Sequence, residues 1–148
     1  GNRSILADPR KIEMQLKVNS AVKYRETFRP FAPAVLEENA SQIFMIDKKT
    51  RVPFMEKAVL VKNNWKKKIP AVVHVDGTAR LQTVTKESNP FVYSLLEHFD
   101  MLLNTSFNVA GKPILNSIHT ALEFLDKTDL DYVAVIEDEE IYLFSTKT

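Results

Sequence analysis

The segment A-R-L-Q-T-V-T, residues 79–85, alternates apolar and polar residues and therefore predicts a β-strand with two different faces. The turn signal Asp76-Gly77 comes directly before it. Further strands are expected at 54–61 and 71–75, and M-L-L at 101–103 leads into a polar loop. The segments Y-V-A-V-I and I-Y-L-F form a final hairpin across the acidic turn 137–140. A sheet of several strands is therefore expected.

Helix signals lie between these strands. Asp8 is expected to cap a helix over 10–18 that has Pro9 at its first position, after an opening decapeptide without a strand pattern. A second helix is expected at 35–44, and Asn89 and Pro90 open a third through Phe99, whose side chain should face the core. Ser117 caps a fourth helix, over 118–126. Strands and helices that alternate in this way predict an α/β fold, a mixed sheet with helices packed on it.

Length and composition restrict the class of protein. A chain of 148 residues fits a single domain, 1–148, that can bury its own core. It has no apolar run of the roughly 20 residues that a membrane helix needs, so no membrane partner is expected. The absence of cysteine suits a cytoplasmic location. Only three glycines exclude a G-x-G-x-x-G or Walker-type loop. Cationic and small polar side chains would therefore have to hold the phosphates of a bound nucleotide.

The net charge of +1 hides an asymmetry between the two halves of the chain. Residues 1–70 contain fifteen Lys or Arg and seven Asp or Glu, whereas residues 71–148 contain five and twelve. Such an asymmetry indicates either a site for an anionic partner or two halves that attract each other.

The stretch K-Y-R-E-T-F-R-P-F-A-P, residues 23–33, gathers cations beside prolines. Each proline disfavours a helical conformation for the residue before it, so the segment is expected to be extended. Lys23, Arg25 and Arg29 then share one face. This face is either one wall of an anion pocket or a solvated strand.

H-V-D-G-T-A-R, residues 74–80, is the second candidate. His74 and Asp76 share a side of an extended strand, Thr78 offers a hydroxyl, and Arg80 can bind a phosphate or carboxylate with two parallel hydrogen bonds. Two ligands are too few for a metal site. The alternative is a hairpin with a histidine at its rim.

L-N-T-S-F-N-V-A-G-K-P-I, residues 103–114, is the third. Asn104, Ser106 and Asn108 carry short hydrogen-bonding side chains that suit ribose hydroxyls and phosphate oxygens. The same residue types also dominate ordinary turns. No Ser-His-Asp or Cys-His set indicates covalent catalysis.

Together with the opening G-N-R-S-I-L-A-D-P-R, these three motifs occur in an order that resembles the C-terminal domain of the O-carbamoyltransferases that modify antibiotics and nodulation factors. The resemblance runs from residue 1 to about Asp131. It implies a YrdC-like twisted mixed β-sheet with helices packed on it and a basic cavity. It also implies that a larger N-terminal actin-like ATPase-fold domain is absent here, and that this chain is a fragment of about a quarter of the full enzyme.

The resemblance implies an activity as well. Family members use carbamoyl phosphate and ATP to make carbamoyl-adenylate and release pyrophosphate, after which the N-terminal domain transfers the carbamoyl group to an acceptor hydroxyl. ATP is then a substrate, bound with Mg²⁺, and no cofactor is held tightly.

Site roles follow from the matched motifs. Lys23, Arg29 and His74 are the expected catalytic residues, the first two facing phosphate oxygens and His74 carrying or orienting a proton. Arg80 is assigned to phosphate, and Asn104, Ser106 and Asn108 to ribose and the α-phosphate. The remaining residues expected to bind ATP or carbamoyl phosphate are Arg3, Arg25, Asp76 and Thr78.

Two other functions stay open. One is a nucleotide- or RNA-binding module without catalytic activity of its own, against which the acidic second half counts. The other is a docking partner for the N-terminal domain, with the basic half as the interface.

Overall fold

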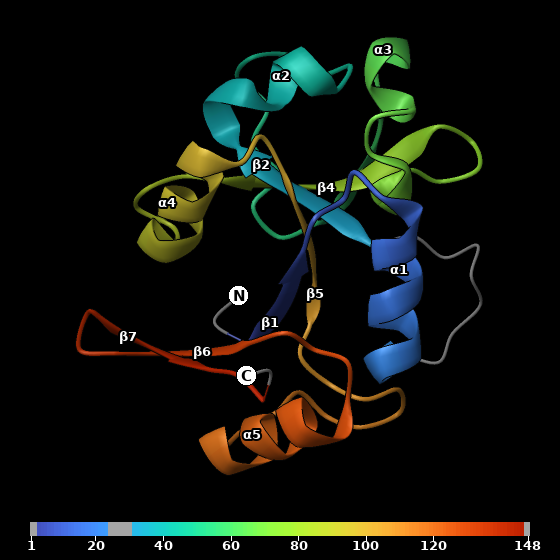
Figure 1. The fold of residues 1–148 in the computed structure, drawn as a ribbon. Coiled ribbons are helices and arrows are strands. Elements are labelled where there is room, and N and C mark those ends of the chain that lie inside the picture. Colours follow the sequence, from blue (N-terminus) through green and yellow to red (C-terminus); the bar gives the residue numbers. More distant parts are fainter. Residues whose placement is uncertain (1–2, 24–30, 147–148) are drawn as a thin grey trace.

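A mixed sheet of five strands organises the chain (Figure 1). The structure, a computed structural model, describes residues 3–23 and 31–146, without the side chains of residues 22 and 23. In spatial order the strands are β1 (Ser4–Ala7), β5 (Leu102–Ser106), β2 (Ala32–Leu36), β4 (Thr78–Val84) and β3 (Lys57–Leu60). β2 and β4 run parallel, and the other neighbours run antiparallel. The expected mixed α/β fold is therefore confirmed.

Strand alternation gives this sheet two different faces. The register pairs Ala34 with Gln82 and Ala32 with Asn104, so these four residues lie on one face. We call it the α4 face, because Leu36, Val84 and Leu102 on it pack against Val92 and Leu96 of α4 (Pro90–His98). The opposite face is the α1 face. Its strand residues in the main core are Ile5, Val35, Ala79, Leu81 and Leu103.

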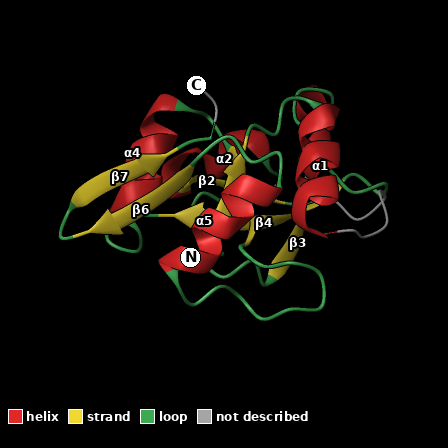
Figure 2. Cartoon of the chain, turned by 60° about the horizontal axis from the view of Figure 1, so that its bottom comes forward, coloured by secondary structure: helices red, strands yellow, loops and turns green. Residues whose placement is uncertain are grey.

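α1 (Ile12–Val18) and α4 lie on opposite sides of the sheet, as Figures 1 and 2 both show. The core on the α1 face includes Val18 of α1 and two residues of a 3-10 turn, η3 (Pro70–Val72). The fully buried Leu103 and Val35 stand in the two middle strands of this core. The α4 face is covered over only part of its area, so the rest is available for polar side chains.

Side-chain caps fix where two helices begin. Asn89 Oδ1 accepts from the Val92 amide at 3.0 Å, and Pro90 occupies the first turn of α4. Ser117 accepts from the Thr120 amide at 3.2 Å at the start of α5 (Ile118–Lys127). The Ser117 cap and a helix start at Asn89 and Pro90 were expected from the sequence, and both are confirmed. Phe99, however, lies just beyond α4 and is 49% exposed, so its expected place in the core is wrong.

Several expected elements differ from the structure. The opening decapeptide contains a strand, β1, and Asp8 bonds to Arg10 rather than capping α1, which begins after Lys11. The expected helix 35–44 starts as β2 and continues as a 3-10 turn, η2 (Glu37–Asn39), and a short α2 (Ala40–Ile43). The expected strand 71–75 is η3 followed by a loop. β1, β2 and η3 each contribute residues to the main core, a long-range packing that the local pattern does not indicate.

The C-terminal hairpin is confirmed as a second, two-stranded sheet of β6 (Val133–Glu137) and β7 (Glu140–Phe144). Its turn residues Asp138 and Glu139 both have positive φ, at 49° and 66°, as a two-residue type I′ turn requires. Figure 2 shows the hairpin on the same side of the molecule as α4.

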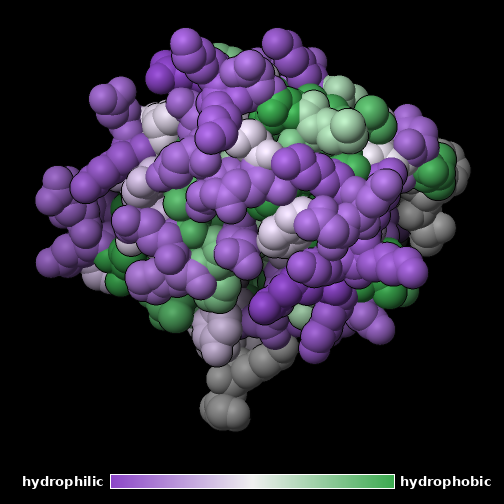
Figure 3. Space-filling view, turned by 90° about the horizontal axis from the view of Figure 1, so that it is seen from above, coloured by the Kyte–Doolittle hydropathy of each residue, from purple (hydrophilic) through white to green (hydrophobic). Residues whose placement is uncertain are grey.

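The upper end of the molecule carries α2 and α3 (Asn63–Lys66). Hydrophilic residues cover most of this surface, with hydrophobic patches between them (Figure 3). None of the helices in the described part of the chain is long and apolar enough to cross a bilayer.

Candidate functional site

Two of the three sequence motifs meet on the α4 face. Thr78 and Arg80 of β4 share this face with Asn104 and Ser106 of β5, because β2 lies between the two strands and sets their register. The β2 residues opposite Gln82 and Asn104 are Ala34 and Ala32, whose short side chains leave this part of the face flat. Residues expected to bind one ligand are thus brought together from distant parts of the chain.

Arg80 is an exposed cation on this face, unpaired in the part of the chain that the structure describes. Its side chain is exposed, and none of the hydrogen bonds or ion pairs within the described residues involves it. β4 holds its backbone between β2 and β3, with Ala58 of β3 as its cross-strand neighbour. A fixed backbone and an unpaired guanidinium suit the binding of a phosphate or carboxylate.

His74, Asp76 and Thr78 form a local hydrogen-bonded turn. The Gly77 amide donates to the His74 carbonyl at 2.9 Å. Thr78 Oγ1 donates to Asp76 Oδ1 at 2.8 Å and lies 3.1 Å from His74 Nδ1. Because the Thr78 hydroxyl has one proton and gives it to Asp76, His74 Nδ1 must be the donor in the second bond. Nε2 of the neutral ring is then left as the acceptor, which makes it the atom that can take up a proton.

Hydrogen bonds from Thr78 also set the charge of this turn. The Thr78 amide donates to Asp76 Oδ1 at 2.9 Å, and this bond, followed by the one from the hydroxyl, lowers the pKa of the exposed Asp76 carboxyl below its usual value. Asp76 is therefore an anion at neutral pH. The carboxylate orders the turn through Thr78, and a phosphate would be repelled by it rather than bound to it.

Gly77 allows this turn to pack against a lysine. Its φ of 80° lies in the left-handed region, and a Cβ placed on it would lie 2.7 Å from Lys66 Nζ. The lysine run of residues 66–68 therefore begins beside the second motif.

Asn104 is held by a residue that the sequence analysis did not single out. Its Nδ2 donates to Gln82 Oε1 at 2.7 Å, and Gln82 Nε2 donates to the Pro53 carbonyl at 3.3 Å. Asn104 is 5% exposed, and its Oδ1 lacks any donor within the described part of the chain. The alternation of A-R-L-Q already placed Gln82 on the face of Arg80, so the signal was present in the sequence.

Ser106 and Asn108 bond to each other. Ser106 Oγ donates to Asn108 Oδ1 at 2.7 Å, and Asn108 Nδ2 donates to the Lys112 carbonyl at 2.8 Å. These bonds order the loop that follows β5. The hydroxyl proton of Ser106 is thereby used within the protein.

The backbone of Arg3 pairs with Phe107, between Ser106 and Asn108, but its side chain is used in a contact elsewhere. Its guanidinium donates to the Leu115 carbonyl at 2.9 Å, and its own carbonyl accepts from the Phe107 amide at 2.8 Å. Arg3 also lines a cavity of about 790 Å³ that follows β1 and β6. The lining of this cavity is mainly apolar, so it is a poor phosphate site.

The first motif is described only at its two ends, at Lys23 and over residues 31–33, where Ala32 and Pro33 begin β2 in the expected extended conformation. Lys23 is the last residue of a π-helical turn, η1 (Asn19–Lys23), so its expected extended conformation is wrong. Its side chain, Arg25 and Arg29 lie outside the described residues, and their expected roles stay predictions. Within the described residues, no group of three or more metal-binding side chains gathers.

These observations define a mixed α/β domain with a polar site on one face of its sheet. A family model for the carbamoyltransferase C-terminus matches residues 1–141, and the chain belongs to this family. Nodulation protein NolO of Bradyrhizobium diazoefficiens is 46% identical over 91% of this chain, and nodulation protein NolNO of Sinorhizobium fredii is 44% identical over the same share. An uncharacterized protein of Methanocaldococcus jannaschii, MJ1058, is 41% identical over 85%.

These relatives are much longer proteins. The matched region makes up 26% of NolO, 21% of NolNO and 22% of MJ1058. The chain thus spans about a quarter of the curated relatives that it matches.

Proposed function

We propose that this chain is the adenylating domain of an O-carbamoyltransferase that binds ATP and carbamoyl phosphate and forms carbamoyl-adenylate. The observation that carries the proposal is the α4 face, where unpaired Arg80 stands with Thr78, Asn104 and Ser106 on two strands separated only by β2. Membership of the carbamoyltransferase C-terminus family supports the same chemistry.

The reaction balances when carbamoyl phosphate, ATP and one water give carbamoyl-adenylate, pyrophosphate and inorganic phosphate. The phosphoryl groups carry the negative charge in this reaction, so Arg80 is the described residue best suited to bind them. Lys23 and Arg29 are proposed as further cations, and His74 Nε2 as a proton carrier or orienter. Mg²⁺ would be held chiefly by the triphosphate, because the described residues gather no set of metal ligands.

Isotope exchange between ATP and pyrophosphate tests the proposal. Exchange should depend on carbamoyl phosphate, and Lys23→Ala and Arg29→Ala should reduce it strongly. Absence of both exchange and ATP binding, with the two variants equal to the parent, would contradict it. Steeply salt-dependent binding of RNA without exchange would favour the alternative of an RNA-binding module.

A second proposed role is docking to the remainder of a longer protein, in which the N-terminal part would transfer the carbamoyl group to the acceptor. Ile136, Ile141 and Leu143 of the hairpin are about half exposed or more, and Ile136 also lines the apolar cavity along β1 and β6. Several exposed apolar side chains on one hairpin favour an interaction site. The relatives are about four times as long as the matched region, which supports the remainder of the same polypeptide as the occupant.

Amide hydrogen exchange tests this docking. In a full-length relative such as NolO, the residues that correspond to β6 and β7 should exchange more slowly than in the isolated 148-residue chain. Equal exchange rates in both proteins would contradict the docking and leave the adenylation proposal untouched.

A further inference from the structure

Asn104 has an incomplete set of hydrogen bonds in the interior of the candidate site. The residue is 5% exposed, and its Oδ1 is buried without a donor among the described residues. Buried polar atoms in native proteins are nearly always paired, so a buried acceptor without a donor indicates a missing partner. Asn104 lies on the α4 face with Arg80, which places this acceptor in the site already described.

The direction of two hydrogen bonds fixes which atom of Asn104 is left over. The Pro53 carbonyl can only accept, so Gln82 turns its Nε2 towards Pro53 at 3.3 Å and its Oε1 towards Asn104. Asn104 must then turn its Nδ2 to Gln82, at 2.7 Å. The reverse orientation of either amide would set two oxygens against each other. The atom of Asn104 that remains available is therefore an acceptor.

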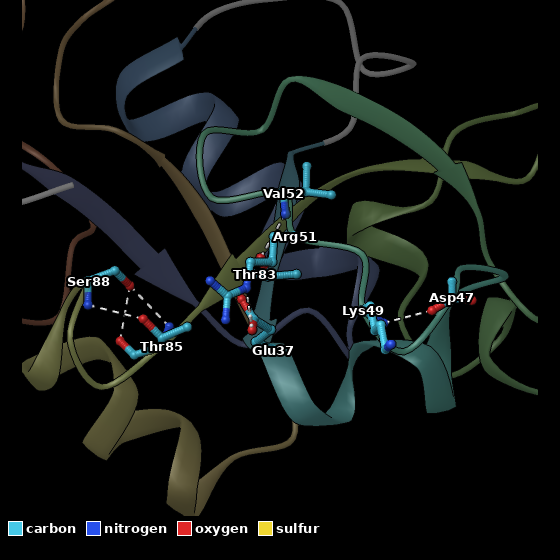
Figure 4. A network of polar contacts seen from close by, with 8 residues as sticks. All are labelled: Glu37, Asp47, Lys49, Arg51, Val52, Thr83, Thr85 and Ser88. Atoms are coloured by element: carbon cyan, nitrogen blue, oxygen red, sulfur yellow. Dashed lines mark hydrogen bonds and ion pairs between the residues drawn. The ribbon is translucent and has the colours of Figure 1, made fainter.

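The position of Pro53 is itself fixed by its neighbour. The Val52 amide donates to Thr83 Oγ1 at 2.9 Å, and the Thr83 amide donates to the Val52 carbonyl at 2.9 Å (Figure 4). Both residues are almost completely buried. This double attachment holds the segment before Pro53 against β4, so the carbonyl that orients Gln82 cannot move freely.

Small residues of β2 leave space for the Gln82–Asn104 hydrogen bond. Gln82 and Asn104 stand on strands that are not neighbours, and the bond between their side chains crosses β2. Their cross-strand partners in β2 are Ala34 and Ala32. Two alanines leave room for the two amides to meet above the strand.

We propose, building on the adenylation function proposed above, that Asn104 Oδ1 accepts a hydrogen bond from the amino group of carbamoyl phosphate. In this arrangement Gln82 is a positioning residue that keeps the oxygen available. A phosphoryl oxygen has no proton to give to an acceptor, so the phosphoryl end of the ligand must lie elsewhere, and unpaired Arg80 on the same face suits it. Asn104 therefore selects for the carbamoyl group and does not hold phosphate. The motif alone had assigned Asn104 to ribose and the α-phosphate.

Acetyl phosphate is the matched probe, because it has a methyl group in place of the amino group and the same phosphoryl end. Calorimetric titration of the chain should give tighter binding of carbamoyl phosphate by about tenfold, the effect of one hydrogen bond to a buried group. Gln82→Met and Asn104→Leu should bring this ratio close to one, and should leave the affinity for inorganic phosphate unchanged.

Gln82→Glu is the conservative control. A carboxylate loses the bond to the Pro53 carbonyl but still accepts from Asn104 Nδ2, so the orientation of Asn104 and the ratio should be kept. The added negative charge weakens both acyl phosphates alike, and for this reason the ratio is the measured quantity. A merely structural role of Gln82 would instead lower the thermal midpoint and all three affinities together.

The outcomes separate this inference from the function on which it rests. If the parent binds carbamoyl phosphate and the ratio is unchanged in folded Gln82→Met and Asn104→Leu, the inference is overturned and the proposed function stands. If Asn104→Leu instead abolishes discrimination between ATP and 2′-deoxy-ATP, the donor is a ribose hydroxyl and the inference is likewise overturned. If the parent binds no acyl phosphate at all, both are overturned.

Discussion

Val52 and Thr83 are joined by two hydrogen bonds that run in opposite directions, each 2.9 Å long. One uses the Thr83 side chain and the other uses its backbone amide (Figure 4). The pairing of β3 with β4 ends at Leu81, and beyond that point Val52 forms hydrogen bonds with the edge of β4. A threonine hydroxyl on the buried side of the strand thus extends the sheet without a further strand.

Thr83→Val should destabilise the domain by about 1–3 kcal/mol, because it leaves the buried Val52 amide without an acceptor. Thr83→Ser keeps the hydroxyl and loses one methyl group, so its cost should be about 1 kcal/mol or less. Urea unfolding of the two variants beside the parent measures both values. Equal losses in the two variants would show that the hydroxyl contributes nothing.

Gly77→Ala and Gly111→Ala form a second matched pair. Both glycines have positive φ, at 80° and 74°, so each substitution should cost roughly 1–2 kcal/mol of backbone strain. Only at Gly77 does the new Cβ meet another residue, Lys66 Nζ at 2.7 Å, whereas nothing lies within 4 Å at Gly111. Gly77→Ala should therefore lose slightly more stability in urea unfolding, and Lys66→Ala should remove that excess. A larger loss at Gly111 would contradict the contact with Lys66.

Local signals explain which parts of the fold were predictable. Alternation in 79–85 identified β4, the Asn89-Pro90 pair and the Ser117 cap identified two helix starts, and two apolar segments around an acidic turn identified the hairpin. The sequence did not predict β2, because all five of its residues are buried and so show no alternation. Pro33 also argues against a central strand. The run 71–75 is apolar because η3 packs in the core, and a short apolar run does not distinguish a strand from a turn.

The site was predictable residue by residue but not as an arrangement. Alternation placed Thr78, Arg80 and Gln82 on one face of a strand. The meeting of Gln82 with Asn104 depends on the register of both strands against β2, which no local pattern encodes. The turn at Asp76 and Gly77 was expected, but His74 before it was expected in a strand, so the bond between His74 and Thr78 was not anticipated.

Asp76 should make the stability of the domain depend on pH. Its pKa is lowered in the folded state, so its carboxylate stabilises the fold above the unfolded value of 3.8, and this contribution is lost as pH falls through the folded pKa. Asp76→Asn should therefore be less stable than the parent at pH 7, and the difference should shrink below pH 3.8. Urea midpoints across this range measure it.

Thr78→Val is the control for this prediction. It removes the hydroxyl but keeps the amide bond to Asp76, which is the larger cause of the lowered pKa. The pH dependence should be weaker in this variant and still present. Parallel pH profiles of the parent and Asp76→Asn would contradict the assignment.

Glu139→Gly should stabilise the C-terminal hairpin. Glu139 has a φ of 66°, which costs an L-residue about 1 kcal/mol and costs glycine almost nothing. The residue is exposed, so the substitution removes no packing. Slower amide exchange in β6 and β7 measures the effect, and Glu137→Gly, inside the strand, is the control that should speed exchange. A faster-exchanging hairpin in Glu139→Gly would contradict the turn geometry.

Arg80→Ala should weaken anion binding without loss of stability. The side chain is exposed and makes no hydrogen bond or ion pair within the described residues, so its removal leaves no partner unsatisfied. The loss of one charge-assisted contact should raise the Kd for carbamoyl phosphate by roughly tenfold or more. Calorimetry measures this Kd, and Arg80→Lys should recover binding only in part, because an ammonium cannot bind a phosphate with two parallel bonds.

Lys57→Ala is the matched control and should have a normal Kd. Lys57 is an exposed cation of β3 that pairs with Leu81 and so lies on the opposite face. Equal weakening by Arg80→Ala and Lys57→Ala would mean that net charge, and not the α4 face, attracts the ligand.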